Sequence, residues 1–186
     1  FWLRKYKKIK ATTFVECYKK YYDKLRLEVI SHYSPTLTCQ KCGQNNLRLL
    51  CVHHVNGGGE KHRAKIHGHV YRWLRQNNYP KGFKILCHNC NRAESFPDFP
   101  KNSWKAKRKI EILQHYSPNL ACSECGCNQL SVLTIHHMNG NGREHLRKIG
   151  LSNFYSWLKE HNYPRDFEVL CLNCNFLKYV ESSKLV

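Results

Sequence analysis

Apolar residues recur at helical spacing in two stretches that each stop at a Ser-Pro turn. Residues 104–115 and their counterpart near 21–32 therefore predict helices. Two short apolar runs, Leu130–His136 and Phe167–Leu170, predict strands instead. Two further helices are predicted at Phe154–His161, which stops before a proline that cannot continue it, and at Asn175–Glu181.

The chain repeats itself at an offset of 83 residues, which lengthens to 84 beyond His62. Each copy holds a His-Tyr-Ser-Pro turn, two Cys-x-x-Cys pairs, a double histidine, an Asn-Gly pair and an Asn-Tyr-Pro turn. Two copies are too few for a solenoid, so we predict an α+β protein of two tandem modules of about 70 residues. The predicted parts are a basic helical extension (1–24), a first module (25–92), a linker (93–107), a second module (108–181) and a tail (182–186).

The formal net charge of +18 indicates a polyanionic partner, most simply DNA or RNA, with an anionic membrane surface as the weaker option. The extension and the first module carry +15 of this charge, so we expect that half to dominate the affinity for phosphates. The cations expected to contact nucleic acid are Arg4, Lys5, Lys7, Lys8, Lys10, Arg63, Lys65, Arg72 and Arg75. A solvated amphipathic helix is the alternative interpretation of the extension.

Composition excludes two classes of protein. The 8 Phe, 4 Trp and 11 Tyr residues supply too much apolar surface for an intrinsically disordered chain. No run approaches the roughly 18 consecutive apolar residues of a membrane span, and no membrane partner is expected. Because Met138 is the sole methionine, we expect Phe1 not to be the translation start.

Eight of the eleven cysteines form four Cys-x-x-Cys pairs, two in each copy. Two such pairs present four thiolates, which is the ligand set of a structural Zn²⁺ site. The predicted zinc ligands are Cys39, Cys42, Cys87 and Cys90 in the first copy and Cys122, Cys125, Cys171 and Cys174 in the second. A redox role or accidental spacing is the alternative, which the duplication disfavours. Reduced thiols indicate an intracellular reducing compartment (cytoplasm, nucleoid or organelle matrix) and not secretion.

The two pairs of a copy are separated by 44 residues in the first copy and 45 in the second, whereas ordinary zinc ribbons close over about 15–20. The intervening segment begins with a double histidine. At a strand end one histidine can hold a metal while its neighbour addresses a water, although histidines also cap strands, stack on bases or bond backbone carbonyls. His62 and His145, which follow the glycine turns, fit a phosphate or metal contact and a structural role equally well.

A strand ending in His-His and Asn-Gly, followed by a strand that runs into Cys-x-x-Cys-Asn, resembles the HNH endonuclease family. The resemblance covers about residues 39–91 and 122–175. It implies a ββα-metal fold in which His54 and His137 are general bases that activate water. It also implies a catalytic divalent metal that stabilises the charge developing on the scissile phosphate. The implied ligands of that metal are His53, Asn91, His136 and Asn175.

Two departures from the family pattern affect these expectations. The implied metal ligands include no carboxylate, which disfavours Mg²⁺ and favours Mn²⁺ or softer ions. The family's middle asparagine is Gly82 in the first copy and Asp166 in the second. An aspartate can brace a loop through its side chain and a glycine cannot, so the second copy is the better candidate for an intact active site.

Two functions remain open at this point. The first is a metal-dependent HNH-type endonuclease that hydrolyses phosphodiester bonds, with His137 and, in a two-site enzyme, His54 as bases. The second is a catalytically silent, zinc-stabilised module that binds RNA or DNA within a large ribonucleoprotein such as a ribosome, beside its proteins. The residues favour the endonuclease by a small margin.

Overall fold

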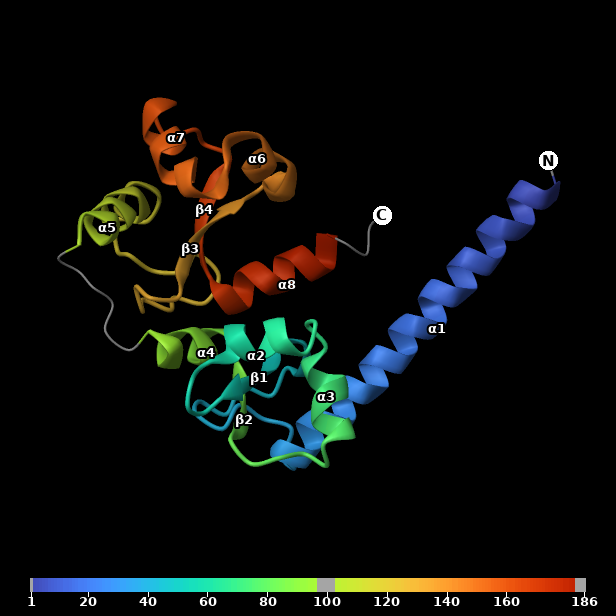
Figure 1. The fold of residues 1–186 in the computed structure, drawn as a ribbon. Coiled ribbons are helices and arrows are strands. Elements are labelled where there is room, and N and C mark those ends of the chain that lie inside the picture. Colours follow the sequence, from blue (N-terminus) through green and yellow to red (C-terminus); the bar gives the residue numbers. More distant parts are fainter. Residues whose placement is uncertain (1, 97–102, 183–186) are drawn as a thin grey trace. The chain divides into compact units, whose positions relative to one another are not determined.

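The computed structural model describes residues 2–96 and 103–182, with side chains described for 16–96 and 103–181. The described residues form a mixed α+β structure with eight α-helices and two two-stranded sheets (Figure 1). The chain divides into two compact units, unit 1 (Phe1–Leu86) and unit 2 (Cys87–Val186). The expectation of an α+β protein is therefore confirmed.

Unit 1 is dominated by one long helix. Its elements are α1 (Trp2–Tyr33), a 3₁₀ turn (Leu47–Leu49), β1 (Leu50–His54), α2 (Gly59–Lys65), α3 (Val70–Gln76) and β2 (Phe83–Cys87), which reaches the boundary with unit 2. Helix α1 is continuous through residue 24, where the sequence predicted the extension to end. Its Leu25 and Val29 are buried against Leu74 of α3, so the C-terminal part of α1 belongs to the core of unit 1.

Unit 2 places a small antiparallel sheet among helices. Its elements are α4 (His88–Ser95), α5 (Trp104–Tyr116), β3 (Leu133–His137), α6 (Gly142–Ile149), a 3₁₀ turn (Leu151–Asn153), α7 (Phe154–Glu160), β4 (Phe167–Cys171) and α8 (Leu172–Ser182). Strands β3 and β4 pair antiparallel, with Leu133 opposite Cys171 and His137 opposite Phe167. The alternate residues Leu133 and Ile135 are buried in the apolar core, as expected for a strand with one face inside.

The Asn-Tyr-Pro turn has the same geometry in both copies. Asn78 and Tyr79 have φ of 55° and 52°, and Asn162 and Tyr163 have φ of 53° each. The amide of Tyr163 donates to Leu158 O over 2.8 Å, which closes the end of α7 with the six-residue bond of a Schellman cap. In this cap two non-glycine residues adopt the left-handed conformation and reverse the chain between α7 and β4.

Most of the predicted elements are present. Strands β3 and β4, and helices α5, α7 and α8, lie at or within three residues of the predicted bounds. The short helices α2 and α6 were not predicted, because the Asn-Gly turns that precede them indicate loop structure and their sequences are highly charged. Among the described residues, no helix combines the length and the apolar character that crossing a membrane requires.

Candidate zinc sites and histidine cluster

Each copy gathers its four paired cysteines into one group. In both groups the four Sγ atoms lie within 4.8 Å of one another, and the two groups are Cys39, Cys42, Cys87 and Cys90, and Cys122, Cys125, Cys171 and Cys174. None of the eleven cysteines, all of which are among the described residues, is in a disulfide. The two groups are compatible with two structural zinc sites, as the spacing predicted.

One pair of sulfurs in the second group has the spacing expected in a zinc site. Tetrahedral Zn–S bonds of about 2.3 Å place neighbouring sulfurs about 3.8 Å apart, and the Sγ atoms of Cys125 and Cys171 are separated by 3.7 Å. Burial raises the pKa of the Cys125 thiol to about 11, and burial with the neighbouring thiols also raises the pKa of Cys174. A bound Zn²⁺ would supply the positive charge that favours the thiolate form of these two thiols.

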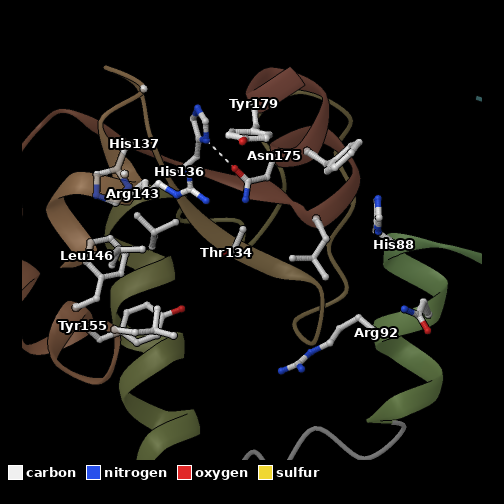
Figure 2. Close-up of a pocket in the computed structure, with 18 of the residues that line it drawn as sticks. His88, Arg92, Thr134, His136, His137, Arg143, Leu146, Tyr155, Asn175 and Tyr179 are labelled. Atoms are coloured by element: carbon white, nitrogen blue, oxygen red, sulfur yellow. Dashed lines mark hydrogen bonds between the residues drawn. The ribbon is translucent and has the colours of Figure 1, made fainter. Parts of the chain in front are cut away.

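The first histidine of the second copy meets the residue that follows the last cysteine pair. His136 Nδ1, at the end of β3, lies 2.7 Å from Asn175 Oδ1, at the start of α8 (Figure 2). These residues are 39 apart in sequence, and the strand-to-helix connection after β4 brings them together. One ring nitrogen and one amide oxygen thus meet in a hydrogen bond, and together they would supply only part of a metal's ligand shell.

His137 lies on the opposite face of β3 from His136. Its side chain is only 8% exposed and stacks on Phe154 at a centroid distance of 5.1 Å. Its Nε2 is 2.8 Å from Nδ1 of His145, on α6. Burial lowers the pKa of His137 to about 4, and the neighbouring His145 and His136 contribute to the same shift. The imidazole is therefore neutral at physiological pH.

The other ring nitrogen of His137, Nδ1, lies close to Gly142. A Cβ placed on Gly142 would lie 2.9 Å from His137 Nδ1. In the first copy a Cβ on Gly59 would lie 2.9 Å from His54 Nδ1. The ring of each second histidine is thus confined on one side by a glycine.

The first copy repeats the histidine pair. His54 Nε2 is 2.8 Å from Nδ1 of His62, on α2, and burial is the main cause that lowers the pKa of His54. Trp73 makes a T-shaped contact with His62, as Trp157 does with His145. The Nε2 atoms of His62 and His145 are both buried and have no hydrogen-bond partner among the described residues. The two histidines that the sequence left open are therefore partners of the candidate bases.

The two copies differ in both backbone conformation and side chain at the position where HNH endonucleases have their middle asparagine. Gly82 has φ of 97°, whereas Asp166 is not in the left-handed region. Both carbonyls nevertheless close the end of the sheet, because Val55 N donates to Gly82 O and Met138 N donates to Asp166 O, each over 3.0 Å. Asp166 also lines a small cavity of about 250 Å³ with His137.

A larger cavity, of about 810 Å³, opens in unit 2 beside His136 and Asn175. Asn91, predicted as a metal ligand of the first copy, lies in α4 and lines this cavity. His53 is 7% exposed at the end of β1.

The sequence did not single out Arg143 and Tyr179, which border the cavity around the His136–Asn175 contact (Figure 2). One available signal was the four-residue spacing that places Tyr179 one helical turn beyond Asn175.

The cations predicted to contact nucleic acid have several environments. Arg63 and Lys65 are exposed on α2. Arg72 donates to Tyr22 OH over 3.0 Å and Arg75 donates to Tyr21 OH over 2.7 Å, so α1 positions both guanidinium groups. The remaining predicted cations belong to the N-terminal part of α1, where the backbone is described and the side chains are not. They are Arg4, Lys5, Lys7, Lys8 and Lys10.

Comparisons of the chain with known protein families, with curated proteins and with solved structures found no match.

Proposed function

We propose that the protein is a metal-dependent nucleic-acid endonuclease of the HNH type, with its active site in the second copy. The observation that carries the proposal is the 2.7 Å approach of His136 Nδ1 to Asn175 Oδ1 beside a large cavity. The next residue of the strand, His137, supplies a neutral imidazole. The net charge of +18 favours a phosphate-rich substrate.

The proposed roles follow from the chemistry of each group. His136 and Asn175 would hold a divalent ion, Mn²⁺ or Mg²⁺. When bound, this ion stabilises charge on the scissile phosphate and on the leaving oxygen. His137 accepts a proton from the attacking water. The two cysteine groups hold Zn²⁺ as structural ions that support this framework.

The base role of His137 requires one particular tautomer. A single proton is shared between His137 Nε2 and His145 Nδ1. If His137 donates it, Nδ1 of His137 keeps the lone pair that a general base needs. His145 then carries its hydrogen on the buried Nε2, and its T-shaped contact with Trp157 is an arrangement in which an N–H can point at an indole face. His145 is therefore a positioning residue for His137.

A cleavage assay with matched histidine variants tests the proposal. Supercoiled plasmid, single-stranded circular DNA and a long RNA are incubated with the full chain and Mn²⁺ or Mg²⁺. His137→Ala is expected to lower the cleavage rate at least about 100-fold, because a general base contributes about 10²–10⁴ to the rate. The control is His54→Ala, the same change in the first copy, with a smaller expected effect. Cleavage that His137→Ala leaves unchanged contradicts the assignment.

A specific observation favours a second candidate, the catalytically silent RNA- or DNA-binding module of a ribonucleoprotein. No carboxylate is among the described residues that line the large cavity, and His137 is only 8% exposed. This candidate predicts two zinc ions per chain, no third ion bound at His136 and Asn175, and no cleavage of any of the three substrates. Titration of the zinc-loaded chain with Mn²⁺, followed by paramagnetic broadening of the His136 resonances, separates the two candidates.

A further inference from the structure

We propose that the large cavity of unit 2 binds an unpaired nucleotide, with its base against aromatic rings and its phosphate beside Arg143. The substrate would then be engaged as a single strand or at an unpaired position, rather than as a regular duplex. The inference rests on the proposed function only for the choice of nucleic acid as the ligand. It concerns binding, and it holds or fails independently of catalysis.

The size of the cavity suits a small planar ligand. Its volume of about 810 Å³ falls within the range of about 300–1,000 Å³ that is usual for small-molecule sites. A partly open space of this size admits one extruded base with its sugar and phosphate. A base inside a duplex is stacked and cannot enter such a site until it leaves the helix.

The charge of the cavity suits a phosphate. Arg143 and Arg92 line it, whereas no acidic side chain is among its described lining residues. Arg143 is exposed on α6, and no hydrogen bond, ion pair or ring contact joins it to another described residue. A guanidinium group without a protein partner is available for bidentate binding of a phosphate.

Aromatic rings supply the complementary part of the site. Tyr179 is 59% exposed and follows Asn175 by one turn of α8, so its ring lies over the His136–Asn175 contact (Figure 2). Phe176 and Tyr155 also line the cavity. Burial raises the pKa of Tyr155 to about 12, so its phenol stays neutral. Exposed rings beside a cation are the usual means of binding single strands without regard to sequence.

The same positions of the first copy have different chemistry. Arg143 corresponds to Glu60, and Tyr179 corresponds to Ser95. The first copy thus has an acid in place of the free cation and no ring in place of the exposed tyrosine. A site with this cation and this ring can therefore form beside the second copy's His136 and not beside the first copy's His53, although the first copy has the larger net charge.

Binding of fluorescent oligonucleotides to the full zinc-loaded chain, without added Mn²⁺ or Mg²⁺, tests the proposal. The probes are 12-nucleotide single-stranded DNA and RNA with one central 2-aminopurine, together with the matching duplexes. We expect stacking to quench the 2-aminopurine of a single strand. Tyr179→Ala is expected to remove the quenching and weaken single-strand binding about tenfold, with Arg143→Glu of similar effect. Duplex binding is expected to change less than about twofold in both variants.

Two exposed residues outside the cavity provide matched controls. Arg147→Glu reverses a second exposed arginine of α6, and Trp104→Ala removes a ring that is 66% exposed on α5. Both should retain the quenching. Quenching and single-strand affinity unaffected by Tyr179→Ala, or lost equally with Trp104→Ala, would overturn the proposal. A wild type that cleaves nothing but shows Tyr179-dependent quenching supports this proposal and contradicts the endonuclease.

Discussion

The two copies differ most clearly in a cluster of charges beside the cysteine groups. In the second copy Lys178 Nζ lies 2.7 Å from carboxylate oxygens of both Glu124 and Glu168. Glu168 is opposite His136 in the sheet, so the cluster borders the candidate site. The first copy has Lys41, Glu94 and Lys84 at the corresponding positions. All three charges are therefore reversed together.

The two copies share some features and differ in others. The cysteine groups and the histidine pairs are the same in both copies, whereas the charges around them are inverted as a set. An inverted set keeps opposite charges at neighbouring positions and reverses the sign of the local field. We infer that the framework is common to both copies and that their divergence lies in how each copy presents charge to a polyanion.

The largest effect expected from any single change is the loss of one zinc site. Cys174→Ser removes a thiolate from the second group, and Cys90→Ser removes one from the first. Because structural zinc contributes about 10–16 kcal/mol to small zinc domains, each variant should lose the fold around its own site. Native mass spectrometry should show one zinc ion per chain in place of two. Cys127→Ser, which changes a cysteine outside both groups, should retain two, and a variant of either group that still binds two would contradict the assignment.

Reversing the charge cluster tests whether its charges act as a set. Hydrogen bonds to Glu124 and Glu168 raise the pKa of Lys178 to about 12, which reflects a mutual stabilisation. Lys178→Glu alone would place three acids together and should lower the free energy of unfolding by about 2 kcal/mol. The triple variant Glu124→Lys, Lys178→Glu and Glu168→Lys gives the second copy the charges of the first. It should recover to within about 1 kcal/mol of the wild type in urea unfolding, and a triple variant less stable than the single one would exclude a simple charge exchange.

The smallest of these effects is a difference in pH dependence. The folded chain protonates His137 only near pH 4, as burial dictates, whereas the unfolded chain does so near the usual value of 6.5. Stability is therefore full above about pH 6.5 and falls as the pH drops toward the folded-state pKa. Between about pH 7.5 and 5.5 the expected loss is about 1 kcal/mol. His137→Gln should flatten this slope of unfolding free energy against pH, and His54→Gln should do so less. Equal slopes in the wild type and in His137→Gln would contradict the burial of a neutral imidazole.

The sequence predicted those features that depend on spacing along the chain. Paired cysteines at matching distances indicated both four-cysteine groups, and apolar runs indicated strands β3 and β4. The sequence could not say which face of β3 is buried, so it could not place His137 in the core beside Phe154. Nor could it show that His145 contacts His137, because that contact depends on where the short helix α6 lies. Arg143 gave no signal on its own, since its proposed role rests on its having no partner among the described residues.

Gly142 and Gly59 have a consequence for the tolerance of this fold to mutation. Each carries no functional group, and neither is needed for a left-handed backbone, since neither is among the glycines with positive φ. Each is instead confined by the imidazole that it faces. Every other amino acid would place a Cβ atom 2.9 Å from Nδ1 of that imidazole. We therefore expect substitutions of Gly142 and Gly59 to be tolerated as poorly as substitutions of the histidines that they face.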